Sequence, residues 1–185
     1  MWATAAIAVV VAIYVGSAAA SLAGLADAVR KGFASDILSR TDLDSLKRSL
    51  VHQLVGAYLE NIGQKRPITS RDRMLVSTVG ASIADAVISD ILTPTNLTAL
   101  LRDGRIAGNA DRPEIKVSAL SAFSLREIDF SRVRVVKPTE FAVELGDGAN
   151  RYGIRMQMAG PITWKLSAVD LPQNLLKTMA ERLPR

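Results

Sequence analysis

The pattern of apolar and polar positions changes along the chain, and its first part is the simplest. The first 26 residues carry no charged side chain, and the first charge is Asp27. A helix needs about 20 mostly apolar residues to span the hydrocarbon of a bilayer. The segment that begins at Trp2 and reaches Leu25 has that length and shows no polar stripe of the kind a surface helix carries. The pattern therefore predicts a membrane-anchor helix over residues 1–30.

Three other interpretations of this segment stay open. Ala18, Ala19 and Ala20 fit a small-residue cleavage site, which is typical of a secretory signal, although no basic stretch precedes the apolar run. The segment could also be a buried core helix, or its true start could lie upstream of Met1. As an anchor, it predicts a single-pass protein of the inner (plasma) membrane. We expect a periplasmic domain, because the N-terminal flank is too short to be a domain.

Helical spacing dominates the chain from residue 35 to 103. After a stop at Lys31-Gly32, we expect a helix from an N-cap at Thr41 to Gly63, with apolar residues recurring every three or four positions. A second helix is expected over 71–92. Thr93 and Pro94 then predict the start of a short helix, because proline is favoured at the first helical position.

The pattern changes to alternation after a linker at 104–113, which is rich in glycine, asparagine and aspartate. Apolar and polar residues alternate in four short runs within 116–172, with turn signals between the runs, and this predicts an antiparallel meander. A short helix is expected over 174–182. Helices followed by a sheet indicate an α+β fold. We expect one domain over residues 31–185, following the anchor at 1–30.

The composition limits the number of domains and the kinds of site that the chain can form, but it does not indicate a function. About 155 residues follow the anchor, enough for one domain with a real core. Cysteine is absent, which excludes disulfides and thiolate metal sites. The 23 basic and 18 acidic residues give a net charge of +5, which is spread along the chain and fits ordinary solubility as well as attraction to anionic headgroups.

Several segments, in this order, resemble one bacterial family. They are an apolar helix running into SLAGLADAVR (21–30), DLDSLKRSL (42–50), DILTPTNL (90–97) and ITWKLSAVDLP (162–172). The chain is similar to the family called domain of unknown function 2939. The resemblance implies a single-anchor envelope protein with a helical half and a C-terminal sheet, and no known activity. At the level of fold alone, a helix followed by a curved sheet is similar to nuclear-transport-factor-2-like and cystatin-like proteins.

Motifs for catalysis are missing. His52 is the single histidine, and the chain has no nucleophile elbow, phosphate-binding glycine loop or tightly spaced metal-ligand cluster. We therefore expect no catalytic, metal or cofactor-binding residues. The chain is more consistent with a non-catalytic binding or structural module than with an enzyme. The alternative is an enzyme with a polar pocket inside a cone-shaped α+β fold.

One face of the predicted sheet is charged. Its basic residues form a candidate face for an anionic ligand: Arg132, Arg134, Arg151, Arg155 and Lys165. Glu140 and Glu144 lie on the same face, so cross-strand ion pairing is the simpler interpretation. The nine aromatic residues do not alternate with these cations, and nucleic-acid binding is not expected. The expected partners are the membrane, through the segment from Trp2 to Leu25, and a protein or anionic ligand.

Overall fold

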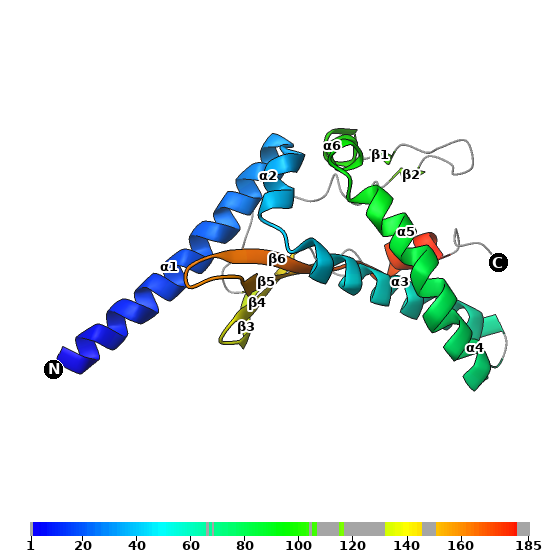
Figure 1. Ribbon diagram of the computed structural model, residues 1–185, viewed down its shortest axis with the longest axis horizontal. Coiled ribbons are helices and arrows are strands. Elements are labelled where there is room, and N and C mark those ends of the chain that lie inside the picture. Colours follow the sequence, from blue (N-terminus) through cyan, green and yellow to red (C-terminus); the bar gives the residue numbers. More distant parts are fainter. Residues whose placement is uncertain are drawn as a thin grey trace.

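The computed structural model describes residues 2–65, 67, 69–103, 105–106, 115–116, 132–145 and 151–180. It confirms the α+β fold, with an apolar helix first, a helical part next, and then a four-stranded antiparallel sheet and a short helix (Figure 1). The helical elements are α1 (Trp2–Lys31), α2 (Ala34–Ser39), α3 (Leu43–Lys65), α4 (Ser70–Leu75), η1 (Val76–Gly80), α5 (Ala81–Ile91), α6 (Pro94–Asp103) and α7 (Gln173–Ala180). The strands are β1 (Arg105–Ile106), β2 (Ile115–Lys116), β3 (Val133–Lys137), β4 (Glu140–Leu145), β5 (Tyr152–Met158) and β6 (Trp164–Asp170).

Helix α1 ends where the sequence predicts a stop. Gly32 has a φ of 69°, a conformation that glycine adopts without a steric penalty. The amide of Phe33 donates to the carbonyl of Ala28, and the amide of Gly32 donates to the carbonyl of Val29. These two bonds form a Schellman motif, which satisfies the last carbonyl groups of the helix and turns the chain back towards α2.

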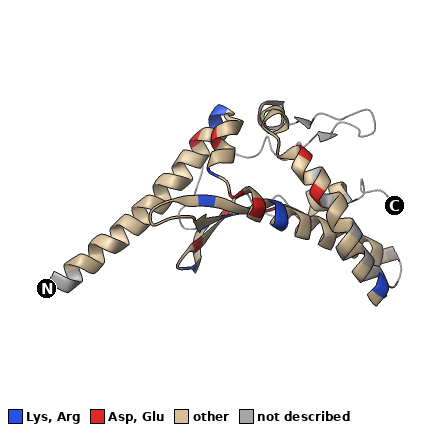
Figure 2. Cartoon of the chain, viewed as in Figure 1, with Lys and Arg blue, Asp and Glu red and all other residues tan. Residues whose placement is uncertain are grey.

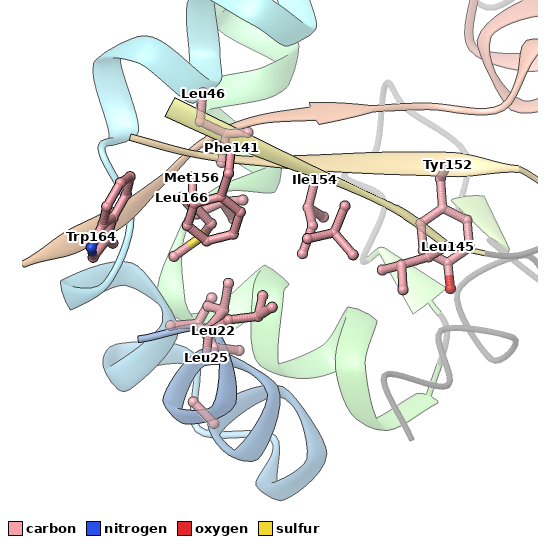
Figure 3. Close-up of a cluster of buried hydrophobic side chains, with 13 residues drawn as sticks. Leu22, Leu25, Leu46, Phe141, Leu145, Tyr152, Ile154, Met156, Trp164 and Leu166 are labelled. Atoms are coloured by element: carbon pink, nitrogen blue, oxygen red, sulfur yellow. The ribbon is translucent and has the colours of Figure 1, made fainter. Parts of the chain in front are cut away.

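The main sheet has the strand order β3-β4-β5-β6, and each pair is antiparallel. Its alternating apolar residues point to one face, which packs against α1, α2 and the start of α3 (Figure 3). The core formed there contains Leu22, Leu25, Ala28, Ile37, Leu46, Phe141, Val143, Leu145, Tyr152, Ile154, Met156, Trp164 and Leu166. The predicted boundary at residue 30 is thus the end of a helix, but the core extends across it.

Helix α3 runs beside β6 and continues past the end of the sheet. A second, smaller core lies there around Leu54, Ala57 and Leu176, and joins α3 to α7. The side chain of Gln53 connects α3 to the end of β6. Its oxygen accepts from the amide of Leu171 at 2.9 Å, and its nitrogen donates to the carbonyl of Val169 at 2.8 Å.

Several predicted helix limits differ from the structure. The cap of α3 is Asp42, whose carboxylate accepts from both the amide and the hydroxyl of Ser45. Thr41 instead forms a bridge to β6 and donates its hydroxyl to Ile37. The helix does not end at Gly63 but continues to Lys65, since a glycine inside a long helix weakens it without necessarily breaking it.

The helix expected over 71–92 is three consecutive pieces. The π-helical turn η1 interrupts it between α4 and α5. In contrast, Thr93 caps α6 as predicted, because its hydroxyl accepts from the amide of Asn96. Residues 181–182 of the predicted last helix, and most of the predicted linker at 104–113, lie outside the described residues. Residues 105–106 of that linker are in fact β1, which pairs with β2.

Strand β3 departs from the predicted alternation. Val133 packs against the core, but Val135 on the same face is 65% exposed. The reason is position: β3 is the edge of the sheet, and a register shift between Val135 and Lys137 ends its regular pairing with β4. The alternation predicted the strand correctly, but not how much of it the helices cover.

Candidate functional site

The two halves of α1 lie in different surroundings. Along the N-terminal half, apolar side chains are exposed on all sides of the helix: Ile7, Val9, Val10, Val11, Ile13 and Val15. Val10 is 65% exposed, whereas Leu22 and Leu25 in the other half are each 3% exposed. Figure 2 shows that α1 is free of charged residues until its C-terminal end. Among the described residues, α1 is the one helix long and apolar enough to cross a membrane, by length and composition.

An aromatic clasp, formed by Tyr14, Phe141 and Trp164, marks the point where α1 meets the sheet. The ring of Trp164 lies edge-on to Tyr14 at 5.2 Å and to Phe141 at 5.1 Å between centroids. Its indole N–H donates to the hydroxyl of Ser17 at 3.1 Å. The hydroxyl of Tyr14 donates to the carbonyl of Pro138 at 2.6 Å, in the turn between β3 and β4. The clasp therefore fixes where α1 leaves the domain.

The clasp also marks one end of the exposed stretch of helix, since each residue from 5 to 13 is exposed. Residues 2–13 supply about 18 Å of helix, at about 1.5 Å per residue. The hydrocarbon of a bilayer is about 30 Å thick. A span that began at Trp2 would therefore include residues of the clasp, and the segment from Trp2 to Leu25 is shared between exposed surface and protein core.

The predicted charged face exists on the side of the sheet opposite to α1, and its cations are largely paired. Arg134 and Arg151 both approach Glu144, at 3.4 and 3.8 Å. Arg155 pairs with Asp170 at 2.7 Å. Lys165 is partly exposed on β6, opposite Gln157 on β5.

Arg132 is exposed just before β3 and has an interaction of its own. The five predicted cations therefore spread across the whole width of the sheet rather than converging on one point.

A groove of about 430 Å³ lies on this side of the sheet, between the sheet and α3. Its lining is mostly polar: Ser45, Arg48, Ser49, His52 and Gln53 from α3, with Glu140, Arg155, Gln157, Ser167 and Ala168 from the sheet. Arg155 is the one predicted ligand-face residue that lines it. Its Nη2 bonds to Asp170, but its Nε is buried and has no hydrogen-bond partner among the described residues.

Most groove residues were not singled out from the sequence, although a signal was present. Ser45, Arg48, Ser49 and His52 recur at spacings of three and four residues, and so form a polar stripe on one face of α3. Arg48 and His52 also line a second groove of about 820 Å³ between α3 and α5. Because Arg48 and His52 stand between the two grooves, they are the side chains that a ligand in either groove would meet.

The pKa is shifted at three described groups, none of which lines the groove, although Ser45, which bonds to Asp42, does line it. Hydrogen bonds from Lys31 and Arg30 lower the pKa of Asp27, and the Ser45 hydroxyl and amide lower the pKa of Asp42. Burial raises the pKa of the Tyr152 hydroxyl. No group of three or more histidine and carboxylate side chains that could hold a metal ion occurs in the described part of the chain.

Comparison with known families matches residues 7–100 to the family described as "Protein of unknown function (DUF2939)". The matched region runs from the exposed half of α1 into α6 and covers just over half of the 185 residues. Comparisons with curated proteins and with solved structures gave no significant match, so the similarity to cystatin-like folds stays a prediction. The chain, with its apolar first helix and helical half, belongs to the DUF2939 family of proteins of unknown function.

Proposed function

We propose that this protein is a membrane-anchored, non-catalytic module, in which the exposed half of α1 lies in a bilayer and holds the α+β domain at the membrane surface. One observation carries the proposal: large apolar side chains are exposed around residues 7–15 of α1, while one face of the same helix packs against the sheet from Ala18 onward and buries Leu22, Leu25 and Ala28. A contiguous apolar surface of this kind is unfavourable in water and indicates a membrane or protein contact.

Lipid is favoured over a protein groove because the exposed side chains surround the helix. A helix that docks in a groove on a partner protein presents one apolar face and keeps the other polar. Here Val9, Val10 and Val11 are consecutive, so they point in different directions, and all three are exposed. No described residue before Asp27 is charged.

The proposal is tested by moving charge into the exposed half of the full-length chain. A Val10→Lys plus Ile13→Lys variant should shift from the membrane pellet to the supernatant after alkaline extraction, because a lysine at bilayer depth costs several kcal/mol. A matched control, Gln157→Lys plus Gln173→Lys, adds the same charge at exposed positions of the domain. Equal extraction of both variants would contradict the anchor.

The proposed location is the inner membrane with the domain on the periplasmic side. This is the arrangement implied by the resemblance to single-anchor envelope proteins. Fusions of a periplasm-active and a cytoplasm-active reporter to the C-terminus test it. Activity of the cytoplasmic reporter would place the domain on the other side.

A second role, binding of a small anionic ligand, is favoured by the groove between α3 and the sheet. The buried Nε of Arg155 offers an N–H that lacks an acceptor among the described residues, and Arg48 and His52 lie in the same groove. A buried unpaired donor is costly, so an anionic ligand that accepts from it would be stabilised.

Calorimetric titration with inorganic phosphate tests this role. Arg155→Gln should weaken binding, whereas Arg134→Gln should not, since Arg134 pairs with Glu144 outside the groove. Equal binding by the two variants would remove the groove as the site. Chemical turnover of a bound ligand would instead favour the enzyme alternative.

A further inference from the structure

The tips of two hairpins form the end of the domain from which the exposed half of α1 extends. The β3–β4 hairpin turns at Pro138 and Thr139, and the β5–β6 hairpin turns at residues 159–163. The carbonyl of Thr139 accepts from the amide of Met158 at 2.9 Å, which holds the two tips together. The bond from Tyr14 to Pro138 attaches α1 to the same place. In Figure 1 the turn between β5 and β6 lies beside the middle of α1, while α3, α4, α5 and α7 lie towards the opposite end of the sheet.

These tips expose apolar side chains. Ile162 is 61% exposed in the second turn, and Val135 and Val136 are exposed at the end of β3. Pro138 and Pro161 are exposed in the same turns. Single exposed apolar residues are ordinary on a protein surface. Here, however, they gather at one end of the domain and continue the apolar surface of α1.

The charged residues near the tips are mainly basic. Lys137 is 69% exposed beside the first turn, and Lys165 follows the second turn in β6. Glu140 forms an ion pair with Lys137 at 3.5 Å, but the side chain of Glu140 is largely covered. A positive rim around an apolar tip fits the anionic headgroups of a bilayer surface.

We propose that both hairpin tips rest in the interfacial region of the bilayer that holds α1, with Ile162 and Val135 among the lipid headgroups and upper acyl chains. This rests on the proposed membrane anchoring. The clasp supports it: Tyr14 bonds to the carbonyl of Pro138, so insertion of α1 as far as Tyr14 brings the first tip, and the second tip bonded to it, down to the membrane surface. With α1 and two tips in contact, the sheet has a fixed orientation on the membrane.

The absence of cysteine allows a direct test with single-cysteine variants of the full chain. Nitroxide labels are placed by Ile162→Cys and Val135→Cys on the tips, by Val10→Cys on α1 and by Lys177→Cys on α7. Each protein is reconstituted into vesicles of phosphatidylcholine and phosphatidylglycerol. The accessibility of each label to oxygen, which concentrates in lipid, and to a water-soluble nickel chelate is then measured.

The expected result is an oxygen-to-nickel ratio that is highest at position 10, intermediate at 162 and 135, and lowest at 177. Tip labels with the same ratio as position 177, together with a lipid-exposed position 10, would overturn this inference and leave the anchor intact. A water-exposed position 10 would overturn the anchor itself. Because Ile162 and Val135 are exposed, their cysteine variants should unfold at the same temperature as the parent protein.

Discussion

The two halves of α1 are built from similar residues but have opposite surroundings. Both are uncharged as far as Ala26, and both continue one unbroken helix. The first half exposes its side chains on all sides, whereas Leu22 and Leu25 of the second half are covered by the sheet (Figure 3). An apolar sequence therefore favours burial, but the surrounding structure decides which part of the segment is covered by protein.

Small residues make the second half suitable for packing against protein. A Cβ atom at Gly24 would lie 2.6 Å from Nη1 of Arg40, so glycine lets that side chain lie across the helix. Ala18 and Ala28 likewise let neighbouring elements approach α1 closely. The first half has larger branched residues, Val9, Val10 and Val11, which present apolar surface to their surroundings.

The largest expected effect comes from truncating one apolar side chain in the second half. Leu25→Ala should lower the free energy of unfolding by about 2–5 kcal/mol, because it removes packed atoms and leaves a cavity. Val10→Ala in the first half should change it by less than about 0.5 kcal/mol, because Val10 is 65% exposed and has little packing to lose. Thermal unfolding in a mild detergent, followed by circular dichroism, measures both. Equal destabilisation by the two variants would mean that the halves do not differ in this way.

A smaller effect is expected at the junction of the halves. Tyr14→Phe removes the bond to the Pro138 carbonyl and should lower the free energy of unfolding by about 1 kcal/mol. The aromatic contact with Trp164 remains in this variant. Tyr58→Phe, in the second core, removes a hydroxyl away from α1 and is the matched control for measurements in the same detergent. Should Tyr14→Phe have no effect, the hydroxyl would not contribute to fixing α1.

The buried half of α1 is also held through the chain that follows it. Residues 40–42 attach to β6 through two backbone bonds. The amide of Leu166 donates to the carbonyl of Arg40, and the amide of Asp42 donates to the carbonyl of Leu166. Asp42→Ala should lower the free energy of unfolding by about 1 kcal/mol at neutral pH, the usual cost of losing an N-cap.

The effect of Asp42 should depend on pH in a defined direction. The bonds from Ser45 lower the pKa of Asp42 in the folded protein, so its contribution is complete above the unfolded pKa of about 3.9 and is lost as the pH falls through the lowered folded value. The difference between Asp42→Ala and the parent should therefore shrink in acid. Asp42→Asn keeps a capping side chain without the charge, so its difference from Asp42→Ala should not follow the same titration.

The smallest effect is expected at the C-terminal end of α1. Asp27 pairs with Arg30 and Lys31, and these bonds lower its pKa, but all three side chains are solvent-exposed. Asp27→Asn should change the unfolding temperature less than Tyr14→Phe or Asp42→Ala, and any difference should vanish at high salt, because exposed ion pairs are screened. A large loss of stability would show that this end of the helix contributes more than its exposure indicates.

Much of the fold could be predicted, because local patterns were strong. Alternation placed all four main strands, and Gly32 and the Thr93-Pro94 pair placed one helix end and one helix start. One error occurred where two neighbouring residues could serve the same purpose. Thr41 and Asp42 are both good caps, and the contact between Thr41 and β6 left the cap to Asp42.

The candidate site was less predictable than the fold. The charged face was placed correctly on the sheet, but most of its cations pair with Glu144 and Asp170. Of the five predicted cations, only Arg155 lines the groove, because α3 passes over the part of the sheet where Arg155 lies. The position of α3 depends on contacts such as those that Gln53 makes with Val169 and Leu171. Each of these contacts joins residues more than 100 positions apart in the sequence.

The sequence by itself determined that an uncharged helix comes first and that an antiparallel sheet follows the helical part, since both follow from local apolar periodicity and turn residues. The tertiary structure decided how that helix is divided. The contacts of Tyr14 and Ser17 with Trp164 join segments about 150 residues apart, and no local pattern encodes such a pairing. The clasp thus divides one apolar segment into a helix that packs in the core and a helix that is exposed.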